Sequence, residues 1–200
     1  MRRPDRYCLK RQQIKMSWNP INCYNIIKRK PLNEQNLNIF QSEWKSKTLC
    51  RLYFNGDVTD TVFKRTYNEN GRDIFETLCS MERRLDNVVF RSHFSHSIFN
   101  ARKMVSEGRI LVNGRKVTWP DYRLKNGDLL QVDPKYWKEI YPVAQNPFQR
   151  IWSFLPSYLE VSYPTLSTIM LRSPKFNEIP SPYPKFMIEN MGAFYSKRKG

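Results

Sequence analysis

The hydrophobic pattern between Ser97 and Val132 changes its period once, and this change constrains the fold more than any other feature. Apolar residues first recur at helical spacing, and from Ile110 onward they alternate with a period of two. Gly108 stands between the two patterns, where a glycine commonly ends a helix. Asn113-Gly114 is the strongest short signal for a two-residue hairpin turn. The segment is therefore predicted to form a helix followed by antiparallel strands.

The predicted helix covers 97–107 and begins at Ser97, which is a good N-cap residue. Arg102 flanks its apolar stripe and Lys103 points away from it. The stripe itself consists of Ile98, Ala101, Met104 and Val105. Strands are predicted at 110–112, 116–118 and 129–132, with a second turn at Asn126-Gly127-Asp128.

A longer helix is predicted upstream, where six apolar residues recur at spacings of three and four. These residues are Ile74, Leu78, Met81, Leu85, Val88 and Val89. The spacing predicts one continuous helix, with Arg83, Asn87 and Arg91 projecting from its other side. Two helices packed on a small sheet indicate an α+β protein.

The composition divides the chain around a compact unit at 83–133. Residues 1–35 are predicted to form a basic arm, and residues 36–82 a helical region that a turn at Asn55-Gly56-Asp57 splits in two. Residues 134–200 form a C-terminal extension, which holds eight of the 13 prolines between positions 142 and 184. Long helices and central strands are not expected between positions 142 and 184. Its many aromatic residues are expected to pack back on the body of the protein.

The charge of the chain predicts a polyanionic partner. There are 34 Lys and Arg residues against 18 Asp and Glu, giving a net charge of +16. The excess is +8 over residues 1–50 and +5 over residues 83–133, whereas residues 51–82 carry −2. Nucleic acid is the usual partner of such a chain, and an anionic membrane is the second option. No apolar run reaches the roughly 20 residues that span a bilayer.

Within 83–133, basic and amide side chains fall on helix surfaces and hairpin tips. Arginine forks match phosphate geometry, and amides can bind ribose or bases. RNA is favoured over DNA because no helix here is long and basic enough to be a plain recognition helix. The candidate RNA-binding residues are Arg83, Arg84, Asn87, Arg91, Arg102, Lys103, Arg109, Asn113, Arg115, Lys116, Arg123 and Lys125.

No metal, cofactor or small-molecule site is predicted. The four cysteines form no CxxC pair, which favours free thiols in a reducing compartment. His93 and His96 have no evident third ligand and are interpreted as loop histidines near RNA. Phe90 and Phe94 are expected in the core, whereas Phe99 is a candidate for stacking on a base.

Residues 83–133 resemble the S-four RNA-binding domain. The stretches Arg83-Arg84-Leu85-Asp86-Asn87-Val88-Val89 and Ile110-Leu111-Val112-Asn113-Gly114 match its strongest motifs. Upstream, the stretch from 44 to 67 is similar to the helical part of the S-four family of small-subunit ribosomal proteins. Downstream, Pro156-Ser157-Tyr158-Leu159-Glu160-Val161 and Phe194-Tyr195-Ser196-Lys197 are similar to its C-terminal segments.

Other features resemble the fungal mitochondrial members of that family. The ending Ile179-Pro180-Ser181-Pro182-Tyr183-Pro184 is similar to theirs, and the N-terminal cysteine cluster of many bacterial members is absent. Nine Lys or Arg residues and one acid, Asp5, lie in residues 1–30. That composition is typical either of a mitochondrial transit peptide or of an RNA-binding arm, and it does not separate the two.

The resemblance implies a structural constituent of the mitochondrial small ribosomal subunit. Such a protein binds small-subunit rRNA, contacts the neighbouring S-five family protein and supports assembly and accurate translation. Two alternatives carry the same domain: an RNA-modifying enzyme and a free RNA-binding factor. The triplet Arg84-Leu85-Asp86 is similar to one that holds the catalytic aspartate of pseudouridine synthases. Because no room exists here for their catalytic domain, Asp86 is predicted to pair with neighbouring basic residues, and the protein not to be an enzyme.

Overall fold

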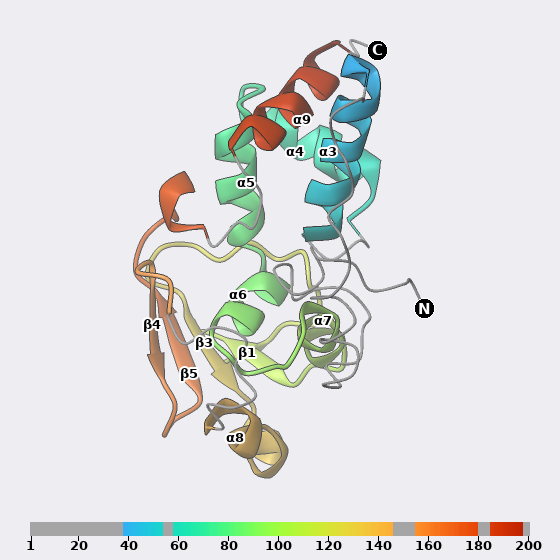
Figure 1. Cartoon of the computed structure of the whole chain (residues 1–200). Coiled ribbons are helices and arrows are strands. Elements are labelled where there is room, and N and C mark those ends of the chain that lie inside the picture. The colour runs from blue at the N-terminus through green and yellow to red at the C-terminus, as the bar shows by residue number, and fades with distance from the viewer. Residues whose placement is uncertain (1–37, 54–57, 146–154, 180–184, 198–200) are drawn as a thin grey trace, which may run out of the picture. The chain divides into compact units, whose positions relative to one another are not determined.

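A computed structural model of the chain describes residues 38–53, 58–145, 155–179 and 185–197. The side chains of 49–53 are outside the described part, as is the predicted arm at 1–35. The chain divides into two compact units, one made of residues 1–77 with 181–200 and the other of residues 78–180. Below they are called the helical unit and the sheet unit. Figure 1 shows the elements of each.

The helical unit contains α3 (Ile39–Tyr53), α4 (Asp60–Glu69) and α9 (Lys185–Lys197), and α5 (Ile74–Glu82) begins in it. The two helices predicted between 36 and 67 are therefore confirmed. Helix α9 packs along α3, so segments from opposite ends of the sequence share this unit.

A buried lysine ties the three helices of this unit together. Lys47 on α3 lies 2.9 Å from the carboxylate of Asp60, and Tyr195 of α9 donates a 2.7 Å hydrogen bond to the same carboxylate. The Lys47 ammonium also lies 4.5 Å from the ring centroid of Phe194 and 4.8 Å from that of Trp44. Carboxylate and ring faces thus replace the water that the ammonium loses on burial.

The sheet unit holds α6 (Leu85–Arg91), α7 (Ile98–Ser106) and five antiparallel strands. The strands are β1 (Ile110–Val112), β2 (Arg115–Lys116), β3 (Leu129–Val132), β4 (Leu159–Ser162) and β5 (Ser167–Met170), in the spatial order β2-β1-β3-β5-β4. A 3₁₀ turn (Pro134–Tyr136) leads into α8 (Trp137–Gln145), and another covers Phe176–Glu178. The α+β class predicted from the sequence is confirmed.

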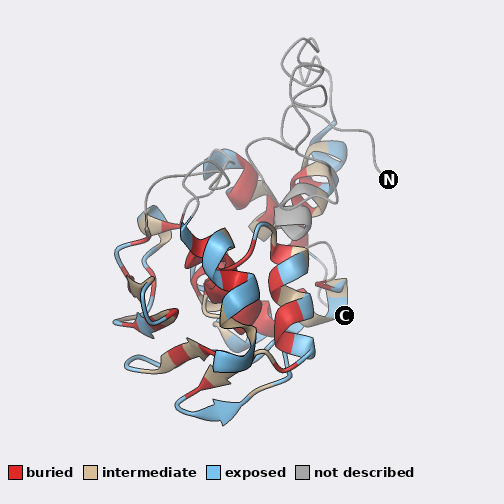
Figure 2. Cartoon of the chain, turned by 90° about the horizontal axis from the view of Figure 1, so that it is seen from below, coloured by how far each residue is buried: buried red, intermediate tan, exposed pale blue. Residues whose placement is uncertain are grey.

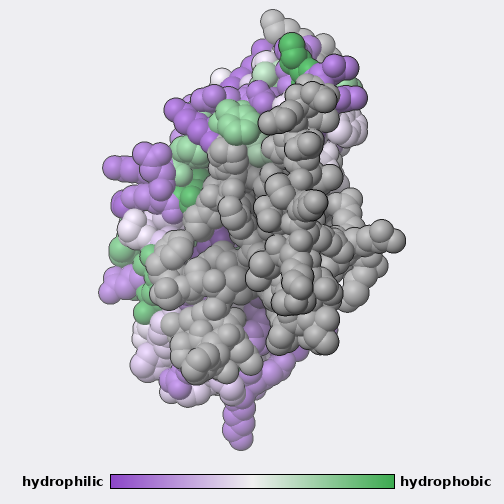
Figure 3. All heavy atoms as spheres, viewed as in Figure 1, coloured by the Kyte–Doolittle hydropathy of each residue, from purple (hydrophilic) through white to green (hydrophobic). Residues whose placement is uncertain are grey.

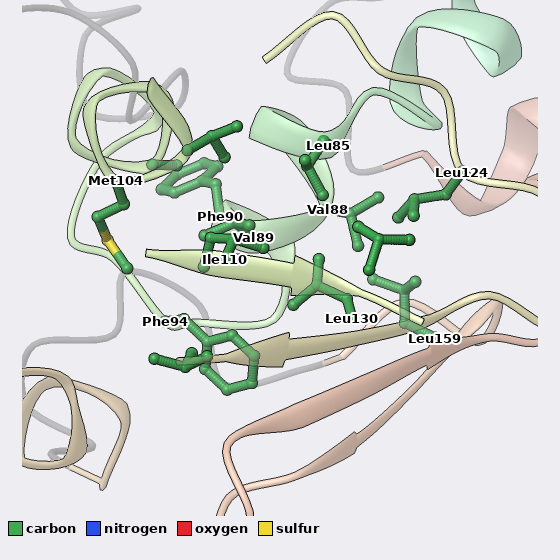
Figure 4. Close-up of a cluster of buried hydrophobic side chains, with 14 of the residues drawn as sticks. Leu85, Val88, Val89, Phe90, Phe94, Met104, Ile110, Leu124, Leu130 and Leu159 are labelled. Atoms are coloured by element: carbon green, nitrogen blue, oxygen red, sulfur yellow. The ribbon is translucent and has the colours of Figure 1, made fainter. Parts of the chain in front are cut away.

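The core of this unit lies between the two helices and the sheet. Figure 4 shows Val88, Val89 and Phe90 of α6 and Met104 of α7 gathered over Ile110 and Leu130 of the strands. Helix α7 has buried residues on one side and exposed ones on the other, whereas all seven residues of α6 are buried. Figure 2 shows where buried and exposed residues lie on the chain. Inward residues of β1 and β3 alternate with partly exposed ones, as the period of two predicted.

Helix α7 forms as its sequence signals indicate. The Ser97 hydroxyl accepts a hydrogen bond from the Asn100 amide, which caps the first turn. Gly108 has a φ of +67°, the left-handed conformation that ends many helices. All four residues of its predicted stripe are buried, and Lys103 is exposed.

The continuous helix predicted across 74–89 is wrong, because the structure breaks it at Arg83 and Arg84. Arg84 is extended, with φ −63° and ψ 142°, and α6 begins at the next residue. The backbone here pairs with a distant loop: Leu124 donates to the Arg83 carbonyl at 2.9 Å, and Leu85 donates to the Tyr122 carbonyl at 2.8 Å. The apolar spacing of three and four continues on both sides of the break, so periodicity alone could not reveal it.

The expectation for the proline-rich stretch between 142 and 184 is also wrong in one respect. Strand β5 lies inside the sheet between β3 and β4, whereas α9, which runs for 13 residues, begins after that stretch. The prolines are not inside these elements: Pro164 precedes β5 and Pro174 follows it. A proline outside a strand removes no ladder hydrogen bond, so the strand can occupy a central position. The sheet therefore extends beyond the predicted boundary at 133.

The hairpin turn has the geometry that its sequence demands. Asn113 and Gly114 have φ values of +50° and +76°, as a type I′ turn requires at both positions. Val112 pairs with Arg115, and β2 covers 115–116, slightly earlier than the predicted 116–118.

Gly114→Val is expected to destabilise the protein by about 1–3 kcal/mol, because a β-branched residue resists positive φ. Crowding does not contribute, since an added Cβ at Gly114 would meet nothing within 4 Å. Gly114→Asn is the matched control, since asparagine tolerates this conformation. Urea denaturation of the full chain measures both variants. Equal stability of the valine and asparagine variants would contradict the assignment of this turn.

Candidate nucleic-acid interface

A buried ion-pair cluster joins the start of α6 to α7 and to the loop before Leu124. Arg84 donates to both oxygens of Asp86, at 3.1 and 2.8 Å, and to Asp121 at 2.6 Å. Arg102 of α7 reaches the same Asp86 oxygen at 3.4 Å and Asp121 at 3.6 Å. We call these four residues the Asp86 cluster. The predicted pairing of Asp86 with neighbouring basic residues is confirmed.

The electrostatics of this cluster follow from its burial. Burial alone would lower the pKa of Arg84, but hydrogen bonds and charge from Asp86 and Asp121 outweigh it and raise that pKa. The Asp86 side chain has no exposed area. It therefore serves as an internal acceptor that orients two arginines.

A second buried network ties α6 to α5 and to the segment before β4. Arg91 donates to the two oxygens of Glu82 at 3.0 and 2.7 Å, and the Tyr158 hydroxyl lies 3.3 Å from Glu82. Desolvation, followed by the charge of Glu82, raises the pKa of the Tyr158 phenol well above its ordinary value. The three side chains form an internal polar network in an otherwise apolar region.

Burial gives three of the predicted RNA-binding residues structural roles instead. Arg84 and Arg91 are buried and form the ion pairs with Asp86, Asp121 and Glu82. Asn87 is also buried and donates a hydrogen bond to the Met81 carbonyl at 2.7 Å. Asn87 and Arg91 were expected on the polar side of a helix. They are buried because α6 is covered on all sides: every residue from Leu85 to Arg91 is buried.

Four further candidates are partly engaged by the protein itself. Arg83 donates twice to the Leu124 carbonyl, at 2.9 and 2.8 Å, and Arg102 belongs to the Asp86 cluster. Arg109 contacts Glu107 at 2.6 Å and Glu139 at 2.7 Å. Asn113 bridges the hairpin to Asp128 at 2.9 Å and accepts from the Leu129 amide.

The remaining five candidates have exposed side chains and define what we call the basic surface. They are Lys103, Arg115, Lys116, Arg123 and Lys125. They lie on α7, on the hairpin and on the loop that follows it. The visible described surface is mostly hydrophilic in Figure 3, with apolar side chains in small separate patches.

The acidic residues near this surface are largely held in internal contacts. Asp86 and Asp121 face Arg84, and Asp128 accepts from the Lys125 amide at 2.7 Å and from Asn113. Glu107 contacts Arg109, with Lys103 at 3.6 Å. The five exposed cations carry charge that suits the binding of phosphates.

The histidines and phenylalanines differ partly from expectation. His93 is buried, with its Nδ1 3.0 Å from the Tyr163 hydroxyl, whereas His96 is exposed. Phe90 and Phe94 lie in the core as predicted, and Phe99 is half-buried against it. Among the residues that the structure describes, no group of three potential ligands could hold a metal ion. Within the same ranges no helix is long and apolar enough to cross a membrane.

Sequence reasoning did not identify Glu82, Asp121 and Tyr158 as members of the polar networks. Asp121 lies 37 residues from its partner Arg84, and Tyr158 lies 76 residues from Glu82. No local pattern in the sequence connects residues so far apart.

Comparison with known proteins matches the same part of the chain. The S4 domain matches residues 83–130. Small ribosomal subunit protein uS4 of Ruegeria sp. TM1040 is 35% identical over 166 residues, which cover 80% of this chain and 78% of that protein. The chain belongs to the uS4 family. The uS4 protein of Methylorubrum populi is 37% identical over 79% of this chain and 77% of its own length. The uS4 protein of Ruegeria pomeroyi is 34% identical over 70% of this chain and 69% of its own length.

Proposed function

We propose that the protein is a structural, non-enzymatic constituent of the small ribosomal subunit, which binds small-subunit rRNA through the basic surface. The observation that carries this is the separation of charges in the sheet unit. Asp86 and Asp121 pair with the buried Arg84, while Lys103, Arg115, Lys116, Arg123 and Lys125 are exposed. Relatives that match about four fifths of the chain are named as small-subunit ribosomal proteins.

The geometry favours recognition of folded RNA by shape and backbone. The outward cations belong to α7, the hairpin and the following loop, and not to one long helix. Cations on several elements can contact phosphates on neighbouring strands of a folded RNA. The Asp86 cluster holds Arg102 and the loop in place, which lowers the entropic cost of ordering them on binding.

We further propose that this subunit is mitochondrial and that the S-five family protein is a neighbour. The basic, acid-poor stretch at 1–30 and the proline-rich stretch at 179–184 support the organellar assignment. Fractionation of cells, with sedimentation of the mitochondrial lysate, tests it. The protein should travel with small subunits, and its recovery with free large subunits would favour the rescue-factor alternative.

Reversal of two charges tests the interface directly. Arg115→Glu with Lys116→Glu should weaken binding to small-subunit rRNA by about 2 kcal/mol or more, since each charge-assisted contact contributes roughly 1.5–3. The log–log salt slope should become shallower by about 1–2, because two phosphate contacts are lost. Filter binding of the full chain across salt concentrations measures both quantities.

The control is Arg65→Glu with Arg72→Glu, which changes the net charge equally on exposed residues of the helical unit. Binding of this control should change much less, and its melting temperature should fall only slightly, because Arg65→Glu loses an exposed ion pair with Glu69. Equal losses in the two double variants would mean that net charge alone drives binding, and that the basic surface is not the interface.

A further inference from the structure

Trp119 is the most exposed aromatic side chain of the sheet unit among the described residues, with 76% of its surface accessible. It lies in the loop between β2 and β3. A tryptophan left so open adds nothing to the core, and its large flat ring has a high affinity for other apolar or π surfaces. Trp119 belongs neither to the two ion-pair networks nor to the basic surface.

The loop that carries Trp119 is fixed to α6 by its backbone. The Pro120 carbonyl accepts from the Asp86 amide at 3.3 Å, and the Tyr122 carbonyl accepts from Leu85 at 2.8 Å. The Trp119 carbonyl closes the turn by accepting from the Tyr122 amide at 3.1 Å. The side chain of Asp121, inside the same turn, is held by the Asp86 cluster. Trp119 therefore projects from a firmly anchored turn.

The charges around Trp119 indicate what it meets. Between 109 and 127 there are five basic residues and one acid, Asp121, which faces two arginines. Lys116 and Arg123, both exposed, lie three residues before Trp119 and four residues after it. The centre of a protein–protein interface is depleted of charged residues. An exposed aromatic ring close in sequence to exposed cations is instead suited to bind a base together with its phosphates.

We propose that Trp119 is a stacking residue for an unpaired base of the bound RNA, adjacent to the phosphate contacts of the basic surface. This inference rests on the proposed rRNA-binding function and adds a residue that reads single-stranded structure. Stacking requires a base that is bulged, looped or terminal, because bases inside a duplex offer no free face. The protein would thereby distinguish a helix with an exposed base from a regular helix of the same charge.

The test is a titration of small-subunit rRNA with the full chain and with Trp119→Ala, Trp119→Leu and Trp119→Phe. Trp119→Ala should lose roughly 10-fold in affinity, in the range measured for removal of one base-stacking aromatic. Trp119→Phe should recover most of the loss because it restores a π face. Trp119→Leu keeps apolar bulk without that face and should recover little. Phe186→Ala, at an exposed aromatic of the helical unit, should bind like the wild-type chain.

The salt dependence separates stacking from a structural role. Loss of stacking removes no phosphate contact, so Trp119→Ala should keep the wild-type log–log slope, whereas Arg115→Ala should reduce its magnitude by about 1. A reduced slope for Trp119→Ala would overturn the inference, because the ring would then only position the cations.

Unchanged affinity of Trp119→Ala, together with poor incorporation into small subunits, would assign Trp119 to a protein partner and would also overturn the inference. If the wild-type chain itself failed to bind the rRNA, the proposed function would fall. If only the Trp119 variants gave results contrary to these expectations, the proposed rRNA-binding function would still hold.

Discussion

Arg91→Leu is expected to destabilise the protein by about 3–5 kcal/mol, the range observed when one partner of a buried ion pair is removed. The side chains of Arg91 and Glu82 are 1% and 0% exposed, and the variant would leave the Glu82 carboxylate buried without its countercharge. Urea denaturation of the full chain, monitored by circular dichroism, measures the change in the free energy of unfolding.

The matched control is Arg65→Leu, which removes an arginine from an exposed pair. Arg65 lies 2.9 Å from Glu69, four residues along α4, and its side chain is 81% exposed. Its loss should cost at most about 0.5 kcal/mol, since exposed pairs contribute little. Arg91→Leu combined with Glu82→Met should recover much of the stability, because an apolar replacement of both partners leaves no buried charge. A loss below about 1 kcal/mol for Arg91→Leu alone would contradict the buried pairing.

Asp86→Ala is expected to have the second-largest effect, with a loss of about 3 kcal/mol or more in stability. Asp86 accepts from Arg84, from Arg102 and from the Asn87 amide at 2.9 Å, and Arg84 is itself buried. Without this carboxylate the N-terminus of α6 loses an anion from its first turn, where the helix dipole favours one. Asp86→Asn should be milder, because an amide oxygen can still accept one of these hydrogen bonds.

The readout for Asp86 is thermal melting alongside rRNA affinity measured well below the melting temperature. Lower melting with only a small loss of rRNA affinity is the expected outcome, because Asp86 acts inside the protein and affects binding only through the order of Arg102 and the loop. Should Asp86→Asn abolish a base modification in rRNA while subunits assemble normally, the enzyme alternative would replace the structural assignment.

Local sequence rules were sufficient to predict α7 and the hairpin. Ser97 caps the helix with its own hydroxyl, Gly108 ends it, and Asn113-Gly114 adopts the positive φ values of its turn. Each of these signals depends on backbone geometry within a few residues, so it needs no knowledge of the rest of the chain. The α+β class followed from the same signals.

Tertiary structure alone decided where the long helix breaks and which arginines are available. Residues 83 and 84 leave helical geometry because the backbone of 83–85 pairs with residues 122–124, a contact that local propensity does not contain. Asn87 and Arg91 are buried because α6 is covered on all sides, while Lys116 and Arg123 stay exposed. In the same way, β5 became an interior strand through its pairing with β3, although the prolines around it indicated the opposite.

The sequence by itself determined how much positive charge the 83–133 segment carries, because charge is a property of residue type. Whether an arginine faces a carboxylate inside the protein or a phosphate outside it depends on chain segments that folding brings together. Arg84 and Arg115 are the same residue type, yet one is held between Asp86 and Asp121 and the other is exposed at the hairpin tip. Burial without a countercharge is too costly for a guanidinium. Tertiary packing, which buries some arginines beside an acid and leaves others on the surface, therefore decided which arginines became structural and which remain exposed.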